Sequence, residues 1–283
     1  MKRIAAIPSI LTLGNGFCGF MSIWYVVRAA TVFKTNAVQF GDYMEMAGWM
    51  VLLAMVFDAL DGKIARMVKA ETDFGSQLDS LADVVSFGVA PACMTMAMSA
   101  ELDSHTLARL GWAAASIFTM CAMMRLARFN VESSHDSEGT MYFAGLPTPA
   151  AGGFVAALVM LRYNIEAMAN ANVEVADIYG PVPAKLLLPI MQPMAAYIPL
   201  LVLALGILMV TRVRYVHVLN KMLGDQEPFG YVIIVVMVSF FFFFTRPFSI
   251  PLAFLIYIVW GLLGGFRSRR LGKKAEEALD GTQ

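Results

Sequence analysis

The sequence predicts an all-α polytopic membrane protein, and two observations carry that prediction. Hydrophobic residues make up 59% of the 283 residues and charged residues only 15%, whereas a soluble domain carries about 25% charged residues. The chain also contains about eight apolar stretches close to the ~20 residues that an α-helix needs to cross a bilayer. We therefore expect a bundle of about eight transmembrane helices embedded in lipid.

Polar joints, or joints that contain Pro and Gly, separate the apolar stretches and set the expected helix ends. The expected helices cover residues 8–31, 44–69, 73–99, 106–129, 148–168, 187–210, 229–246 and 248–266. No internal repeat or inserted soluble domain is visible, so residues 1–266 are treated as a single integral-membrane domain. The polar remainder, residues 267–283, is expected to be a disordered cytoplasmic tail.

The positions of Lys and Arg predict how the bundle is oriented. If both termini lie on one side of the membrane, that side collects fifteen of the 21 Lys and Arg residues, and the other side keeps six. Cytoplasmic loops carry the excess of positive charge in membrane proteins. We therefore expect both termini, and the joint between the second and third helices, on the cytoplasmic side of the inner membrane.

Composition argues against several other kinds of site. The net charge is zero, so no nucleic-acid partner is expected. The three cysteines lie far apart inside apolar segments, which gives neither a disulfide framework nor a CxxC metal site. The three histidines are scattered, which argues against a zinc site.

Four aspartates lie within the second and third predicted helices, where an ionised carboxylate costs several kcal/mol unless it faces protein, water or a cation. Asp58 and Asp61 are spaced i,i+3, and Asp79 and Asp83 are spaced i,i+4, so each pair projects from one helix face. Carboxylates without Cys or His favour hard cations such as Mg²⁺ or Mn²⁺. Four of them on adjacent helices suit a site for two ions ~3.5–4 Å apart.

The residues between the two pairs suit a phosphorylated ligand. Gly62 and Ala65 leave room for a ligand to approach the backbone, and Arg66 offers a bidentate partner for phosphate. A carboxylate that the cations do not need can act as a general base. Two other interpretations are weighed against this one: the acids pair with Lys63, Arg66 and Lys69 between helices, or they line a pathway for cations.

The complete pattern from Asp58 to Asp83, D-x2-D-G-x2-A-R-x8-G-x3-D-x3-D, resembles the signature of the CDP-alcohol phosphatidyltransferases. The resemblance implies a six-helix core, an active site open to the cytoplasmic leaflet, and a homodimer. It implies that Asp58, Asp61 and Asp79 bind metal and that Asp83 contacts metal and serves as the base. The residues that it implies for binding CDP-diacylglycerol are Gly62, Ala65, Arg66, Thr72, Gly75 and Asn15.

Segments that flank the signature are similar to the phosphatidylserine synthase branch of this family. They cover residues 7–19, 86–92, 125–130 and 143–151, and beyond roughly the first 155 residues the similarity is mainly one of hydropathy. The resemblance implies that the phosphatidyl group of CDP-diacylglycerol passes to the hydroxyl of L-serine, giving phosphatidylserine and CMP.

Four polar residues are candidates for binding the acceptor or a lipid phosphate: Ser86, Arg125, Arg128 and Asn130. Ser86 lies one turn after Asp83, and the two arginines share a helix face, where they would grip a phosphate or the carboxylate of serine. The alternative is that they snorkel to anionic headgroups. Glycerol 3-phosphate or an inositol phosphate stays open as the acceptor. A divalent-cation carrier and a purely structural membrane protein are the alternatives outside the enzyme class.

Overall fold

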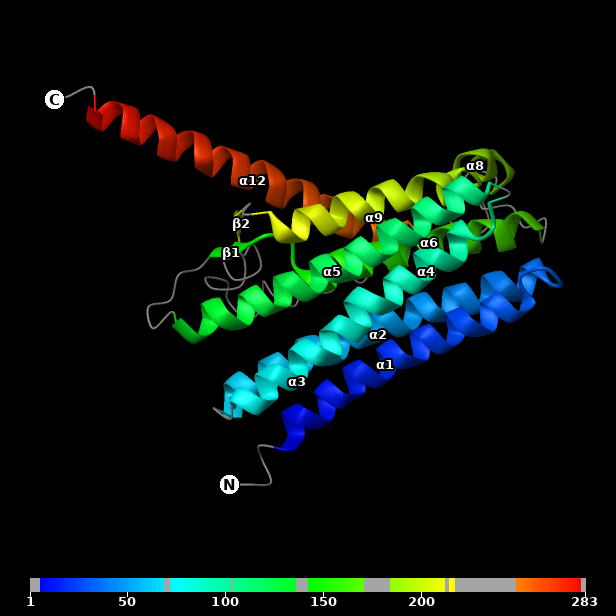
Figure 1. Cartoon of the computed structure of the whole chain (residues 1–283), viewed down its shortest axis with the longest axis horizontal. Coiled ribbons are helices and arrows are strands. Elements are labelled where there is room, and N and C mark those ends of the chain that lie inside the picture. The colour runs from blue at the N-terminus through cyan, green and yellow to red at the C-terminus, as the bar shows by residue number, and fades with distance from the viewer. Residues whose placement is uncertain are drawn as a thin grey trace, which may run out of the picture.

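The computed structural model describes residues 6–68, 72–102, 104–135, 142–170, 184–211, 214–216 and 248–280. In these residues the chain forms a bundle of long helices (Figure 1). The expected helix over 229–246 lies outside the described residues, as does Lys69, and so do the side chains of Ala65 and Arg66.

The first half of the chain supplies an antiparallel hairpin, a rod made of three helical pieces, and a long returning helix. In order these are α1 (Ala6–Val32), α2 (Ala37–Val68), α3 (Asp73–Asp83), the π-helical turn η1 (Val84–Val89), α4 (Ala90–Ser99) and α5 (His105–His135). The rod from α3 to α4 coincides with the expected helix over 73–99, so the sequence located it correctly.

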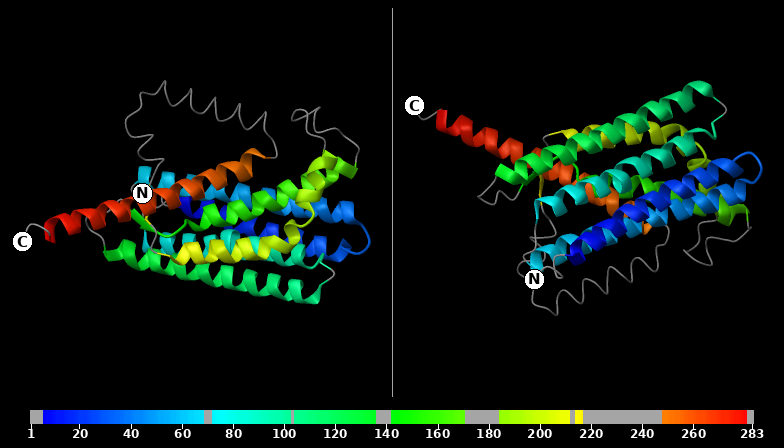
Figure 2. Two further views of the ribbon diagram at one scale, coloured as in Figure 1. Left: turned by 90° about the horizontal axis from the view of Figure 1, so that it is seen from above. Right: turned by 60° about the horizontal axis from the view of Figure 1, so that its bottom comes forward.

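The second half adds a central helix, a broken helix and a C-terminal helix. In order these are β1 (Tyr142–Ala144), α6 (Thr148–Asn170), α8 (Ala184–Met191), α9 (Met194–Val210), β2 (Arg214–Val216) and α12 (Ser249–Asp280). The two short strands pair antiparallel, with Phe143 opposite Tyr215. Helices α5 and α9 lie side by side (Figure 2).

The π-helical turn in the middle of the rod has a local cause. Pro91 has no backbone N–H and its ring crowds the carbonyl four residues earlier, which disturbs α-helical bonding at that point. The N–H of Ala90 bonds instead to the carbonyl of Val85, five residues back. The wider turn is packed between helices that carry glycine, because a Cβ on Gly152 of α6 would lie 2.6 Å from the carbonyl oxygen of Phe87.

Helix α1 shows the inside-out pattern of a membrane protein. Its exposed large side chains are Ile10, Leu13, Phe17, Phe20, Trp24 and Val27, which form one apolar stripe. Its buried side chains include the polar Thr12, Asn15 and Ser22. A helix that turns its polar groups inward and its apolar groups outward is adapted to lipid rather than to water.

The all-α membrane fold is confirmed. Four of the described helical segments are long and apolar enough to cross a bilayer: Ser9–Val32, Ala37–Ile64, Phe74–Ser99 and His105–Glu132. The protein is therefore an integral membrane protein, while the count of eight helices and the side on which the termini lie stay predictions. Helix α6 occupies the centre of the bundle, since nearly all of its residues from Ala150 to Tyr163 are buried.

Two expectations about the second half need correction. The expected helix over 187–210 is divided into α8 and α9, because Pro193 has no N–H to continue the helical bonding. The tail after Phe266 is not disordered throughout: α12 continues to Asp280 and projects beyond the other helices (Figure 1). Its residues there include the strong helix formers Lys, Ala, Glu and Leu, whose propensity outweighs their polarity.

Candidate functional site

Three of the four aspartates meet where the end of α2 faces α3. One carboxylate oxygen from each of Asp58, Asp61 and Asp79 lies within 4.8 Å of the others. Helical spacing explains the convergence, because i,i+3 residues on α2 project from one face, toward the face of α3 that carries Asp79. The carboxylate of Asp61 is buried, with 5% of the residue exposed.

The fourth aspartate, Asp83, joins this group from the last residue of α3. It is 6% exposed, and its charge interacts with those of Asp58 and Asp79. The side-chain amide of Asn15 on α1 donates a hydrogen bond to Asp83 Oδ1, with 3.0 Å between the two atoms. All four acids thus share one buried region between α1, α2 and α3.

Helix α1 holds one acid from each of the other two helices. The hydroxyl of Thr12 donates to Asp61 Oδ2 at 2.8 Å, just as Asn15 donates to Asp83. Thr12 and Asn15 are i,i+3 neighbours, so both point to the same side of α1. Sequence reasoning missed Thr12. The available signal was the pair of polar residues at helical spacing inside an otherwise apolar stretch.

Ser86 fastens the π-helical turn to the same part of α1. Its hydroxyl is fully buried and donates to the backbone carbonyl of Asn15 at 2.9 Å. A Cβ on Gly19 would lie 2.4 Å from Ser86 Oγ and 2.7 Å from its Cα, so only glycine permits this approach. The Ser86 hydroxyl therefore bonds to the backbone of α1 in this structure. Its contact with the acceptor stays a prediction.

The donor set fits a divalent cation. Oδ1 of Asp79 and Oδ1 of Asn15 are both buried and have no hydrogen-bond partner within the described part of the chain. Among the described residues the sole ion pair joins Arg162 and Glu101, so Lys63 neutralises none of the four acids. Buried carboxylates without a cationic partner are strongly disfavoured. Oxygen ligands alone are what hard divalent cations prefer.

Arg125 of α5 also lies near the acids. Its guanidinium interacts electrostatically with Asp58 and Asp83, and its Nη1 donates to the hydroxyl of Thr148 at 3.2 Å. The group also lies over the ring of Phe129, 5.8 Å from its centroid. Arg125 is therefore turned toward the site and not toward lipid headgroups.

The other two acceptor candidates lie in different surroundings. Nη1 of Arg128 donates to the carbonyl of Val210 at 3.0 Å, which satisfies a carbonyl at the C-terminus of α9. The amide of Asn130 donates to the hydroxyl of Ser80 at 2.9 Å and so joins α5 to α3. The i,i+3 spacing of Arg125 and Arg128 did not bring both guanidinium groups to one site.

The residues predicted to bind the nucleotide surround the start of α3 and the end of α2. Thr72 is the N-cap of α3, and its hydroxyl accepts a hydrogen bond from the backbone N–H of Gly75 at 3.0 Å. Gly62 is open, because a Cβ there would meet nothing within 4 Å. That leaves the α2 backbone accessible to a ligand. The nucleotide contacts of these residues, and of Ala65 and Arg66, remain predictions.

Known proteins have sequences similar to that of this chain. A sequence model described as CDP-alcohol phosphatidyltransferase matches residues 5–174. A Helicobacter pylori protein named CDP-diacylglycerol–serine O-phosphatidyltransferase is 30% identical over 257 residues, covering 90% of this chain and 89% of that protein.

Proteins with the same name from two other organisms match shorter parts of the chain. The Saccharomyces cerevisiae protein is 38% identical over 154 residues, which is 53% of this chain and 51% of the relative. The Bacillus subtilis protein is 32% identical over 150 residues, which is 52% of this chain and 71% of the relative. With the family match spanning more than half of its length, and the four aspartates gathered as described, this chain belongs to the CDP-alcohol phosphatidyltransferase family.

Proposed function

We propose that the protein transfers the phosphatidyl group of CDP-diacylglycerol to the hydroxyl of L-serine, giving phosphatidylserine and CMP. The observation that carries the proposal is the convergence of Asp58, Asp61 and Asp79, with Asp83 beside them, in a family of phosphatidyltransferases. The name of the Helicobacter pylori relative supports serine as the acceptor.

The four aspartates would hold two divalent cations, Mg²⁺ or Mn²⁺. Asp58, Asp61 and Asp79 offer the clustered oxygens, and Asp83 adds a fourth carboxylate. When bound, such ions supply Lewis-acid stabilisation of the charge on a pyrophosphate and on the departing CMP. The open backbone at Gly62 and the first turn of α3 at Thr72 and Gly75 receive the cytidine diphosphate, with Ala65, Arg66 and Asn15 as further contacts.

Asp83 takes the proton from the serine hydroxyl. Its Oδ1 already accepts a hydrogen bond from Asn15, so Oδ2 is the atom that receives the proton. The serine oxygen then forms a bond to the lipid-linked phosphorus, and the bond from that phosphorus to the oxygen of CMP breaks. A single in-line displacement accounts for both products, and no covalent intermediate on the protein is required.

The setting of the reaction follows from the same features. The exposed apolar stripe of α1 contacts lipid. The acyl chains of CDP-diacylglycerol stay in that lipid while the headgroup of the substrate reaches the acids. The excess of Lys and Arg at the predicted cytoplasmic side supports a site at the inner leaflet of the inner membrane. The resemblance to the family supports a homodimer as the assembly of this protein.

The decisive experiment measures CMP release by the purified protein in mixed micelles that contain CDP-diacylglycerol and Mg²⁺ or Mn²⁺. L-serine is compared with glycerol 3-phosphate and with inositol compounds, and the lipid product is identified by mass spectrometry. We expect release with serine and phosphatidylserine as the product. CMP release with only one of the other acceptors would show that this compound, and not serine, is the acceptor. Cation uptake into proteoliposomes without CMP release would overturn the enzymatic proposal.

A further inference from the structure

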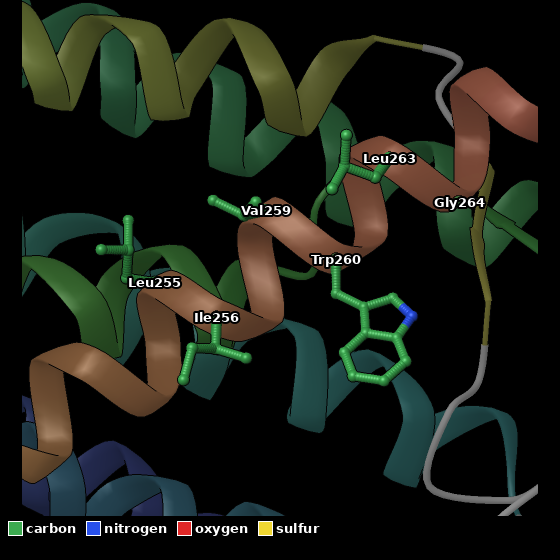
Figure 3. A pocket seen from close by; sticks show the side chains of 6 residues that line it. All are labelled: Leu255, Ile256, Val259, Trp260, Leu263 and Gly264. Carbon is green, nitrogen blue, oxygen red and sulfur yellow. The ribbon is translucent and has the colours of Figure 1, made fainter.

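Helix α12 lies outside the segment that the family model matches, and it has two different faces. One face is exposed and apolar and lines a shallow hollow; its residues are Leu255, Ile256, Val259, Trp260, Leu263 and Gly264 (Figure 3). The other face carries Phe254, Tyr257 and Ile258 and packs against the bundle. Tyr257 is thus the one residue on this inner turn with a polar group.

A glycine on the central helix fixes where the inner face of α12 lies. A Cβ on Gly153 of α6 would come within 2.6 Å of Phe254 Cζ, so the ring of Phe254 rests directly on the α6 backbone. Helices α6 and α12 run in opposite directions (Figure 2). Tyr257 is three residues, or about 4.5 Å, further along α12 than Phe254. Thr148 is five residues, or about 7.5 Å, nearer the start of α6 than Gly153. Because the helices are antiparallel, both displacements have the same direction, and Tyr257 lies toward Thr148.

Arg125 connects this inner face to the acids. Its guanidinium bonds to Thr148 and interacts electrostatically with Tyr257, Asp58 and Asp83. Arg125, Thr148 and Tyr257 come from α5, α6 and α12, and they form one polar corner next to the proposed base. A second substrate bound at this corner would lie next to Asp83.

We propose that Tyr257 is a specificity-determining residue that, with Arg125, binds the carboxylate of the acceptor amino acid. A guanidinium presents two N–H groups that match a carboxylate, and a phenol hydroxyl donates one more hydrogen bond to it. An acceptor anchored there by its carboxylate turns its hydroxyl toward Asp83. The inference rests on the proposed function, since it concerns the acceptor of that reaction.

The test compares L-serine with serinol, in which a hydroxymethyl group replaces the carboxylate. A site built around a polar group discriminates strongly against an analogue that lacks it. In the Tyr257→Phe variant we expect kcat/KM for serine to fall about tenfold to a hundredfold. The value for serinol should change by less than about threefold, and KM for CDP-diacylglycerol should stay the same. Trp260→Phe, on the exposed face of the same helix, is the matched control. It should leave kcat/KM unchanged for both serine and serinol.

The outcomes separate the two claims. If the wild-type protein releases no CMP with serine, the proposed function fails. If it does, but Tyr257→Phe lowers the rates with serine and serinol equally or changes neither, the role of Tyr257 is refuted and the proposed function stands. Binding of CMP in the presence of Mg²⁺, measured by calorimetry, shows that the variant site is folded. A more conservative change at the same corner, Arg125→Lys, should narrow the preference for serine over serinol in the same way.

Discussion

The bundle buries acidic groups at both of its ends and treats them in opposite ways. At the end that contains the turn from α4 to α5, Glu101 forms an ion pair with Arg162 and accepts a hydrogen bond from Tyr163. At the end that contains α3, four aspartates share a region in which no described residue forms an ion pair with them. Figure 1 shows the two ends at opposite extremes of the helices.

The difference lies in what neutralises the acids of each cluster. The charge of Glu101 is neutralised by a side chain of the protein, and the hydroxyl of Tyr163 in turn accepts from Arg162 at 3.0 Å. The aspartates form no ion pair with a described residue, and the buried Oδ1 of Asp79 has no hydrogen-bond partner there either. A membrane protein retains unneutralised acids at such depth where an external cation or a substrate completes the site.

The largest expected effect distinguishes the two ends by activity. Asp83→Asn keeps an oxygen that accepts a hydrogen bond from Asn15 but removes the proposed base, so we expect CMP release to fall by about 10²–10⁴-fold. Glu101→Gln is the matched control at the other end, and its turnover at low temperature should equal that of the wild type. Near-normal turnover in purified Asp83→Asn would refute the assignment of the base.

The next effect distinguishes the two ends by stability. Arg162→Met leaves the buried Glu101 carboxylate without its cation, and breaking a buried pair from one side costs about 3–5 kcal/mol of folding free energy. Thermal unfolding in detergent measures the loss. Adding Glu101→Gln to this variant removes the stranded charge and should restore part of the stability. A single variant as stable as the wild type would show that the ion pair is not formed.

A smaller effect should follow from cation binding at the aspartate end. An ion present at a hundred times its dissociation constant stabilises the folded protein by about 2.7 kcal/mol. We expect Mg²⁺ or Mn²⁺ to raise the Tm of the wild-type protein and to raise that of Asp58→Asn much less. The Glu101→Gln variant should respond like the wild type. An equal rise in all three proteins would indicate a cation site elsewhere.

The smallest effect concerns the support that α1 gives to the acids. Asn15→Leu removes the donor to Asp83, and loss of such an outer partner typically lowers metal affinity or activity about 10–100-fold. Ser22→Ala removes a buried hydroxyl of the same helix, which bonds to the carbonyl of Ala47. That control should lower stability by about 1 kcal/mol without changing the metal dependence of the rate. If the rate of both variants depends on the metal in the same way, Asn15 does not support the metal site.

Much of the site was predictable because helix geometry is local. The spacing of Asp58 and Asp61, and that of Asp79 and Asp83, fixes a common helix face for each pair from sequence alone. Arg125 and Arg128 show where this reasoning fails. Their spacing is equally regular, yet one guanidinium faces the acids and the other bonds to the end of α9. Long flexible side chains take their direction from tertiary neighbours, which spacing does not reveal.

The sequence alone determined the membrane setting, the family and the presence of four acids on two neighbouring helices, because hydropathy, motif and helical period are all properties of short segments. Only the tertiary structure decided which other helices complete the site. Thr12 and Asp61 are 49 positions apart, and Asn15 and Asp83 are 68 apart. Contacts at such separations depend on close helix approaches, made here by Gly14 against Phe57 and by Gly19 against Ser86. Packing of this kind has no signature in any single segment.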